Sequence, residues 1–410
     1  MRSHYPIRLF LLLQAIVPLL LGSGALLKAQ QESQHDLYRQ ERAVRVIAPR
    51  GYLDPIWQRC STPGGDDHTI VLHLGDSHVQ AGFFTMPIRE YFGRQFGLSG
   101  PGLIAPYRIL GTNEPRHMRL QGRRGGYATD QITRRSYAGE GPTGIEMRSI
   151  VSRPQEVTLS TSDGVRFDRV IVFHGPNDRA FSLSGDWSDS PRRPFSLLTA
   201  GFCETDTLDL KRSVTSTKLV IPTGATFYGA SLESRAPGVT VHTLGHNGAT
   251  YQTYLKDHFT SSLSKLKPDL IILSLGTNDA MGRVNSSAVR ASVRSLVDQL
   301  RKSCPEAKIV LSTPVMCYVS RRRGLTASNP NVKLVSRSIV EEAKALGVGY
   351  IDTFEIFGGE RGADRLVSEG LLQGDRIHLT TEGYKSLGNS IADALAKDYK
   401  RYLGSRVMIN

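Results

Sequence analysis

The chain has 410 residues, enough for two domains, and its 51 Lys and Arg against 38 Asp and Glu give a formal net charge of +13. So basic a composition favours anionic surfaces and polymers as partners, but no recognition motif accompanies the charge, which argues against nucleic acid. Cys304 and Cys317 flank one predicted strand and are expected to lie too far apart to pair, and the status of any other disulfide stays open. The cysteines are too few for a disulfide scaffold and show no metal-site spacing: Cys60, Cys203, Cys304 and Cys317.

The N-terminus has the pattern of a secretory signal peptide. Arg2 and Arg8 precede an apolar run over residues 9–21, and small residues follow it. We therefore expect residues 1–29 to be removed, which predicts an exported protein of the bacterial periplasm or cell envelope. An uncleaved N-terminal anchor is the alternative, although the run is short for a membrane span. No stable span is expected after cleavage.

Two kinds of pattern follow one another along the next part of the chain. Residues 30–65 are predicted to form a helical lead-in and a loop, followed by a strand over 69–74 and a helix over 86–96. Between 110 and 235, short β-forming segments separated by turn signals replace the expected strand–helix units. Seven such segments predict an antiparallel β-sandwich. They are residues 144–151, 156–160, 168–174, 195–199, 204–210, 218–222 and 226–232.

From residue 239 the alternation of strands and helices begins again and continues to a last helix predicted over 382–402. The resulting fold class is α/β, with a three-layer α/β/α domain formed by 66–109 and 236–410 and an antiparallel β-sandwich inserted at 110–235. The parallel sheet is predicted to have five strands, at 69–74, 239–244, 270–275, 309–313 and 349–352.

A serine and an Asp–His pair lie far apart in the chain. Ser77 ends a Gly-Asp-Ser sequence directly after the strand over 69–74, and Asp375 precedes His378 by three residues. Serine is a weak nucleophile until an adjacent base takes its proton, and a histidine oriented by a carboxylate is such a base. Each segment alone could be a turn or a helix cap. Together they predict a hydrolytic site.

Glycine and asparagine follow two further predicted strands. Gly248 comes after the strand over 239–244, and Asn278 after the strand over 270–275. Because the carboxyl ends of parallel strands share one edge of a sheet, these residues should meet Ser77 there. The backbone N–H groups of Ser77 and Gly248 and the amide of Asn278 would then form an oxyanion hole. Gly245 is the alternative to Gly248.

In order along the chain, the four segments resemble the four sequence blocks of the SGNH (GDSL-type) serine hydrolases. The resemblance implies that Ser77 is the nucleophile, His378 the base and Asp375 the residue that orients it. It also implies that Gly248 and Asn278 join the Ser77 N–H in the oxyanion hole. It implies no metal and no cofactor. The blocks are Gly75-Asp76-Ser77, Gly245-His246-Asn247-Gly248, Gly276-Thr277-Asn278-Asp279 and Asp375-Arg376-Ile377-His378.

Three other histidines lie near these segments. His73 falls inside the first strand, where a hydrogen-bonded core histidine is expected. His78 is expected to support the loop of Ser77 rather than to act as the base. His246 is a candidate for substrate contact.

The inserted module resembles a feature of bacterial peptidoglycan O-acetylesterases, in which a carbohydrate-binding-module-like sandwich interrupts an SGNH domain after the serine block. The resemblance rests on this layout and on the serine-block context over residues 75–82. It implies hydrolysis of the O-acetyl ester on the muramic acid C6 oxygen, through an acyl-enzyme on Ser77. Trp187, Phe181 and Tyr137 are candidates for glycan contact, with core or loop positions as the alternative. The basic residues 321–323 are either a solvated loop or an attractor for an acidic polymer.

The predicted partner is therefore an acetylated polysaccharide, with peptidoglycan first. Other readings stay open. The enzyme could act on another acetylated glycan or on a lipid acyl ester, or could transfer acetyl groups with the same triad. A non-catalytic glycan-binding protein of the envelope is a further alternative, against which the intact Ser77, Asp375 and His378 argue.

Overall fold

The computed structural model describes most of the chain after the predicted signal peptide. The predicted strand over 195–199 and the basic residues 321–323 lie outside the described residues, as do residues 1–43. Within the described part, no helix combines the length and the apolar character that crossing a membrane requires. The described ranges are 44–62, 68–137, 140–176, 178–184, 187–192, 202–256, 258–320 and 326–407.

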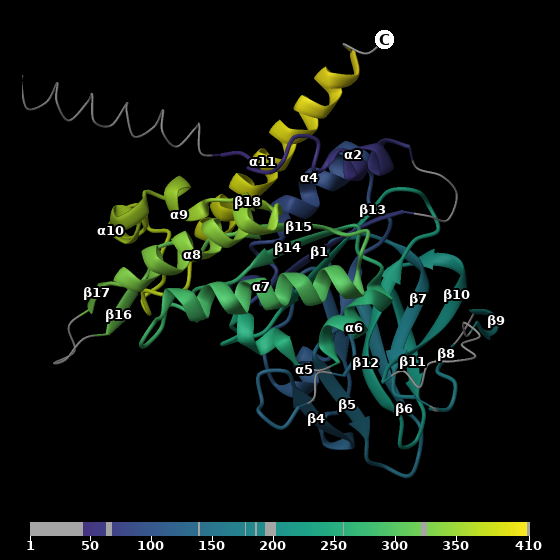
Figure 1. The fold of residues 1–410 in the computed structure, drawn as a ribbon. Coiled ribbons are helices and arrows are strands. Elements are labelled where there is room, and N and C mark those ends of the chain that lie inside the picture. Colours follow the sequence, from purple (N-terminus) through teal and green to yellow (C-terminus); the bar gives the residue numbers. More distant parts are fainter. Residues whose placement is uncertain are drawn as a thin grey trace, which may run out of the picture. The chain divides into compact units, whose positions relative to one another are not determined.

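A parallel sheet of five strands forms the centre of the α/β domain, as the sequence predicts (Figure 1). The strand that ends before Ser77 lies second in the sheet. Its two neighbours are the strand that precedes Gly248 and the strand that precedes Asn278. Its residues are buried on both faces, which explains why the strand is apolar throughout rather than alternating. In spatial order the strands are β13 (Val239–Gly245), β1 (Thr69–Gly75), β14 (Leu270–Ser274), β15 (Lys308–Ser312) and β18 (Gly349–Ile351).

Helices cover both faces of this sheet (Figure 1). One layer holds α7 (Ser286–Ser303) and α8 (Pro330–Leu346), whose buried residues recur at helical spacing. The other holds α2 (Asp54–Ser61), α4 (Met86–Phe96) and α11 (Thr381–Val407). Shorter helices are α3 (Ser77–Gln80), α5 (Tyr107–Leu110), α6 (Phe259–Leu263), α9 (Thr353–Ile356) and α10 (Gly362–Ser368), with 3₁₀ turns at Arg124–Gly126, Tyr251–Leu255, Ser264–Leu266 and Gly359–Arg361.

Two antiparallel sheets form the inserted sandwich, and one apolar cluster fills the space between them. The larger sheet has the order β4 (Tyr127–Gln131), β5 (Ile145–Ser149), β12 (Thr226–Glu233), β7 (Phe167–His174), β10 (Glu204–Val214), β9 (Trp187–Arg192), with β2 (Gly102–Ile104) also on β12. The smaller sheet has the order β3 (Met118–Gln121), β6 (Gln155–Thr161), β11 (Ser216–Ile221), β8 (Ser182–Ser184). A separate hairpin joins β16 (Tyr318–Ser320) and β17 (Thr326–Ser328).

Antiparallel pairing begins before residue 110, the predicted start of the insert. Ile104 of β2 pairs with Ala230 of β12. Gly102 has a φ of +100°, and a Cβ there would come within 2.7 Å of the Val241 carbonyl oxygen. β2 therefore joins the sandwich while passing close to β13, and only glycine fits that crossing.

A buried arginine joins the sandwich to the α/β domain. The guanidinium of Arg89, on α4, donates to the Pro101 carbonyl at 2.9 Å and to Asp163 Oδ2 at 3.3 Å. Asp163 lies in the turn between β6 and β7, so the contact fixes one end of the sandwich against α4. Removing one partner of such a buried pair would leave an uncompensated charge.

The aromatic side chains proposed for glycan contact are core residues where the structure describes them. Phe181 is 0% exposed and Tyr137 4% exposed, so the core alternative is correct for both. The side chain of Trp187 lies outside the described part.

The four cysteines are buried and form no disulfide bond.

Candidate active site

Ser77 lies at the first residue of a one-turn helix that follows β1 directly. The Asp76 carboxylate begins this turn by accepting a hydrogen bond from the His78 N–H at 2.9 Å. Gly75 permits the tight exit from the strand, because a Cβ there would lie 2.6 Å from the Ser274 carbonyl oxygen. The serine hydroxyl is thereby held at the carboxyl edge of the sheet.

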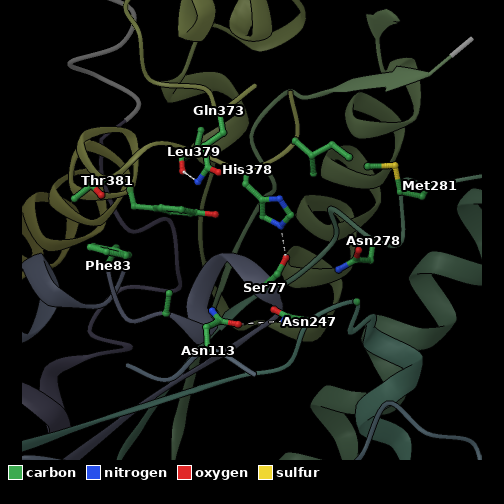
Figure 2. A pocket seen from close by; sticks show the side chains of 14 residues that line it. Ser77, Phe83, Asn113, Asn247, Asn278, Met281, Gln373, His378, Leu379 and Thr381 are labelled. Atoms are coloured by element: carbon green, nitrogen blue, oxygen red, sulfur yellow. Dashed lines mark hydrogen bonds between the residues drawn. The ribbon is translucent and has the colours of Figure 1, made fainter. Parts of the chain in front are cut away.

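A continuous hydrogen-bonded series joins the three predicted catalytic residues. Ser77 Oγ lies 2.8 Å from His378 Nε2, and His378 Nδ1 lies 2.7 Å from Asp375 Oδ2 (Figure 2). This geometry suits a neutral ring that donates its Nδ1 proton to Asp375 and accepts the serine proton at Nε2. The structure therefore brings together the three side chains that the sequence predicts as nucleophile, base and orienting carboxylate.

Asp375 also shapes the loop that presents His378. Its Oδ1 accepts from the backbone N–H groups of Ile377 and His378, each at 2.9 Å. Arg376, which lies between Asp375 and Ile377, adopts a left-handed φ of +60°. Burial alone would raise the pKa of Asp375, but these donors and the His378 ring hold that pKa below its ordinary value. The carboxylate thus stays ionised beside the histidine.

Three potential oxyanion donors face one cavity of about 570 Å³ together with Ser77 and His378. Within the described part of the chain, neither the Ser77 nor the Gly248 N–H donates to a protein acceptor. The Asn278 amide donates to the Ala249 carbonyl at 2.9 Å and to Asp76 Oδ2 at 3.3 Å.

The structure also separates the two candidate glycines. Gly248 lines the cavity in a left-handed conformation with φ +79°. Gly245 lies at the end of β13, where its N–H donates to the Tyr107 hydroxyl at 3.3 Å. Gly248 is therefore the glycine available for the oxyanion hole.

Asn278→Ala should lower kcat by about 10²–10³-fold, because the amide would contact the oxygen where charge develops in the transition state. KM should change little, since the contact strengthens mainly at that stage. Steady-state kinetics on a short-chain chromogenic ester test this, with a thermal melt as the folding control. An unchanged kcat would leave Asn278 as a turn residue only.

Two buried carboxyl groups lie behind these donors. Burial raises the pKa of Asp76 to about 7 and that of Asp279 to about 6. The nearby Asp279 charge adds to the rise at Asp76. Below neutral pH Asp76 is then largely protonated, so no full negative charge opposes an oxyanion at the neighbouring donors.

The raised pKa of Asp76 predicts a pH-dependent stability. The fold favours the protonated form, so this contribution is fully present below the ordinary pKa of 3.8 and is lost as pH rises through about 7. Asp76→Asn should flatten the decline of the unfolding free energy between about pH 4 and pH 7. Denaturant titrations at several pH values measure this. An identical decline in the variant would show that Asp76 is not its source.

The other histidines have structural positions. His73 is buried and bonds Thr85 Oγ1 and Ser274 Oγ, both at 2.8 Å, which confirms a hydrogen-bonded core histidine. His246 is 1% exposed and bonds the Tyr254 hydroxyl at 3.0 Å. His246 does not line the cavity, so the structure gives it no path to substrate.

His78 packs beside the predicted base. Its ring lies 5.2 Å from the His378 ring between centroids, and its Nδ1 lies 3.1 Å from the Tyr384 hydroxyl. Burial, aided by the charge of His378, lowers the pKa of His78 to about 3. A neutral His78 can support the loop without competing for the serine proton.

A polar network beneath the cavity was not foreseen from the sequence. The Gln80 side chain accepts from the Asn247 N–H at 2.7 Å and donates to the Asn113 carbonyl at 2.8 Å. Asn247 Nδ2 donates to Asn113 Oδ1 at 3.2 Å, and both asparagines line the cavity (Figure 2). Gln80 lies one helical turn after Ser77, and this spacing could have placed it near the site. The position of Asn113 depends on the path of the inserted segment.

Comparison with known proteins agrees with this geometry. Residues 198–385 match the model of the GDSL-like lipase/acylhydrolase family, a range that includes Gly248, Asn278, Asp375 and His378. The fold and the Ser–His–Asp geometry are those expected of SGNH-type serine esterases. Residues 198–385 are similar to the GDSL-like lipase/acylhydrolase family. The match excludes Ser77, which the sandwich separates from the rest of the domain.

One solved structure shows the same fold over most of this chain. A peptidoglycan O-acetylesterase superposes with a TM-score of 0.72 at 20% identity, covering 87% of this chain and 99% of that one. A lipase/acylhydrolase from Enterococcus faecalis has a TM-score of 0.31 at 20% identity, covering 40% of this chain and 77% of that one. A search of curated proteins found no match.

Proposed function

We propose that this protein is an exported serine esterase that removes O-acetyl groups from peptidoglycan, at the C6 oxygen of muramic acid. The observation that carries the proposal is the composition of the cavity wall. Asn113, from the inserted segment, lies beside Asn247 and opposite His378 in the cavity that contains Ser77. The insert thus forms part of the ester site. The superposition on a peptidoglycan O-acetylesterase extends over the insert as well and supports the proposal.

The cavity has the chemistry of a site for an acetylated sugar. The side-chain amides of Asn113, Asn247 and Gln373 can exchange hydrogen bonds with sugar hydroxyls. Met281 and Ile377 supply apolar contact suited to a methyl group. A few oriented polar groups among apolar ones are typical of a small-ligand pocket.

Acylation follows from the hydrogen-bonded series. Ser77 Oγ attacks the acetyl carbonyl carbon while its proton moves to His378 Nε2, and the carbonyl oxygen gains negative charge at the oxyanion donors. The bond to the sugar oxygen then breaks. His378 returns the proton to that oxygen, which releases the free hydroxyl and leaves an acetyl ester on Ser77.

Deacylation repeats these steps with water. A water molecule attacks the acetyl-Ser77 carbonyl carbon through its oxygen while His378 takes one of its protons. The bond to Ser77 Oγ breaks, the proton returns to the serine, and acetate leaves. Asp375 holds the ring and stabilises its charged form at both stages.

Acetate release from insoluble O-acetylated peptidoglycan, compared with acetylated xylan, tests the proposed substrate. We expect a higher kcat/KM on peptidoglycan, no release from base-treated peptidoglycan, and none with Ser77→Ala on either polymer. Release from xylan with none from peptidoglycan would contradict the proposal and favour another acetylated glycan.

Export is proposed from residues 1–29 alone. The basic start, apolar run and small residues support signal cleavage. N-terminal sequencing of the protein from an envelope fraction should give a start at Gln30. A protein that retains Met1 in that fraction would favour the anchor.

A further inference from the structure

A second cavity of about 940 Å³ adjoins the ester pocket. Phe83 and Thr381 line both cavities, and Figure 2 shows these two residues on the side of His378 away from Asn278. One wall comes from α4 and the start of α11, and the other from residues 114–119 and 162–163 of the insert. We call this cavity the side groove. It leads away from the nucleophile between the two parts of the molecule.

Both walls of the side groove are held in place. The Arg89–Asp163 contact fixes the sandwich turn to α4, and Arg89 is 2% exposed. On the opposite wall the Arg116 N–H donates to the Ala81 carbonyl at 3.3 Å, and the Ser162 hydroxyl donates to the Arg116 carbonyl at 2.6 Å. The groove therefore exists before a ligand enters, which lowers the cost of binding.

Most charges that line the side groove are already paired. The Glu114 carboxylate lies 3.2 Å from Arg108 and 3.8 Å from Arg119. Lys385 lies 2.8 Å from Glu382. These side chains are therefore poor candidates for charge recognition of a ligand.

Arg116, in contrast to these charged residues, has no ionic partner among the described residues. Its guanidinium lies 5.3 Å from the centroid of the Phe83 ring. Phe83 is one of the two residues shared by the groove and the ester pocket. An available cation is thus held at the junction of the two cavities. Glu90, likewise without an ionic partner in the described ranges, lies further into α4.

We infer that the side groove binds the peptide borne by the sugar whose ester is cleaved, with Arg116 pairing a carboxylate of that peptide. This inference rests on the proposed function. Muramic acid bears its acyl ester on C6 and an anionic peptide through the ether on C3, so one sugar can supply both cavities. A guanidinium pairs a carboxylate with two parallel hydrogen bonds. A neutral glycan strand offers no such partner.

Kinetics on two matched substrates test this: an O-acetylated disaccharide with its peptide, and the same disaccharide-peptide after its peptide carboxylates have been converted to amides. For the wild type, KM should be about three- to tenfold lower on the substrate with free carboxylates. In Arg116→Ala the KM values on the two substrates should be about equal. In Arg116→Lys part of the wild-type difference between these KM values should remain. Added salt should weaken the wild-type preference, because the pair is exposed to solvent.

Arg153→Ala is the control, since it removes the same charge from an exposed position that lines neither cavity; the preference should persist. Equal wild-type KM values on the two substrates would overturn the inference while leaving the proposed function intact. So would a preference that survives Arg116→Ala. No acetate from either substrate, with hydrolysis of a chromogenic acetyl ester retained, would instead overturn the proposed function.

Discussion

Ser77→Ala should reduce kcat by about 10⁶-fold, to the level supplied by binding and the oxyanion donors alone. No other hydroxyl is placed at 2.8 Å from His378 Nε2 in the described structure, so the variant lacks the atom that forms the acyl-enzyme. Folding should be preserved, because among the described residues Ser77 Oγ forms a hydrogen bond with His378 alone. The measurement is turnover of a short-chain chromogenic ester at high enzyme concentration.

Thermal melting provides the control for Ser77→Ala. A melting temperature near that of the wild type would assign the loss to chemistry. Substantial turnover by a cleanly folded variant would contradict a serine mechanism and would require another nucleophile.

His378→Ala should lower kcat by about 10⁶-fold, and Asp375→Asn should lower it by about 10⁴-fold. The histidine moves the proton in every step, whereas the aspartate only orients and supports it. In Asp375→Asn the retained Oδ1 can still accept from Ile377 and His378, so the loop should persist. The new amide would face Nδ1 and favour the wrong tautomer. Both kcat values can be measured on the same small ester.

The order of these two losses is the informative result. Equal losses would show that the carboxylate is as necessary as the base. A larger loss from Asp375→Asn than from His378→Ala would overturn the assignment of His378 as the base.

The α/β part of the fold could be predicted because its signals are local. Each parallel strand is a continuous apolar run, and α4 begins and ends where its apolar periodicity does. The sequence does not predict β2, β3, β4, β8 or β9 of the inserted module, and β2 and β9 show why. β2 has three residues and exists through its pairing with β12, more than a hundred residues away in the chain. β9 has a proline and alternates little, so its pairing with β10 left no pattern to detect.

The site residues also fall into two groups, those predictable from local sequence and those that depend on the packed structure. Ser77, Asp375 and His378 could be proposed because their chemistry requires these residue types next to strand ends. Asn113 and Arg116 could not, because their places depend on how the inserted segment passes the site. Asp76 was visible in the Gly-Asp-Ser sequence, but its raised pKa follows from burial, which only the packed structure determines.

Labelling with an organofluorophosphate, followed by peptide mapping by mass spectrometry, tests the central claim most directly. The reagent reports an activated serine because it needs the same base and oxyanion donors as the ester. We predict one adduct per chain, on the peptide that contains Ser77, with loss of esterase activity in proportion to labelling. Ser77→Ala should remain unlabelled. An adduct on any other residue, or full esterase activity in completely labelled protein, would contradict Ser77 as the nucleophile.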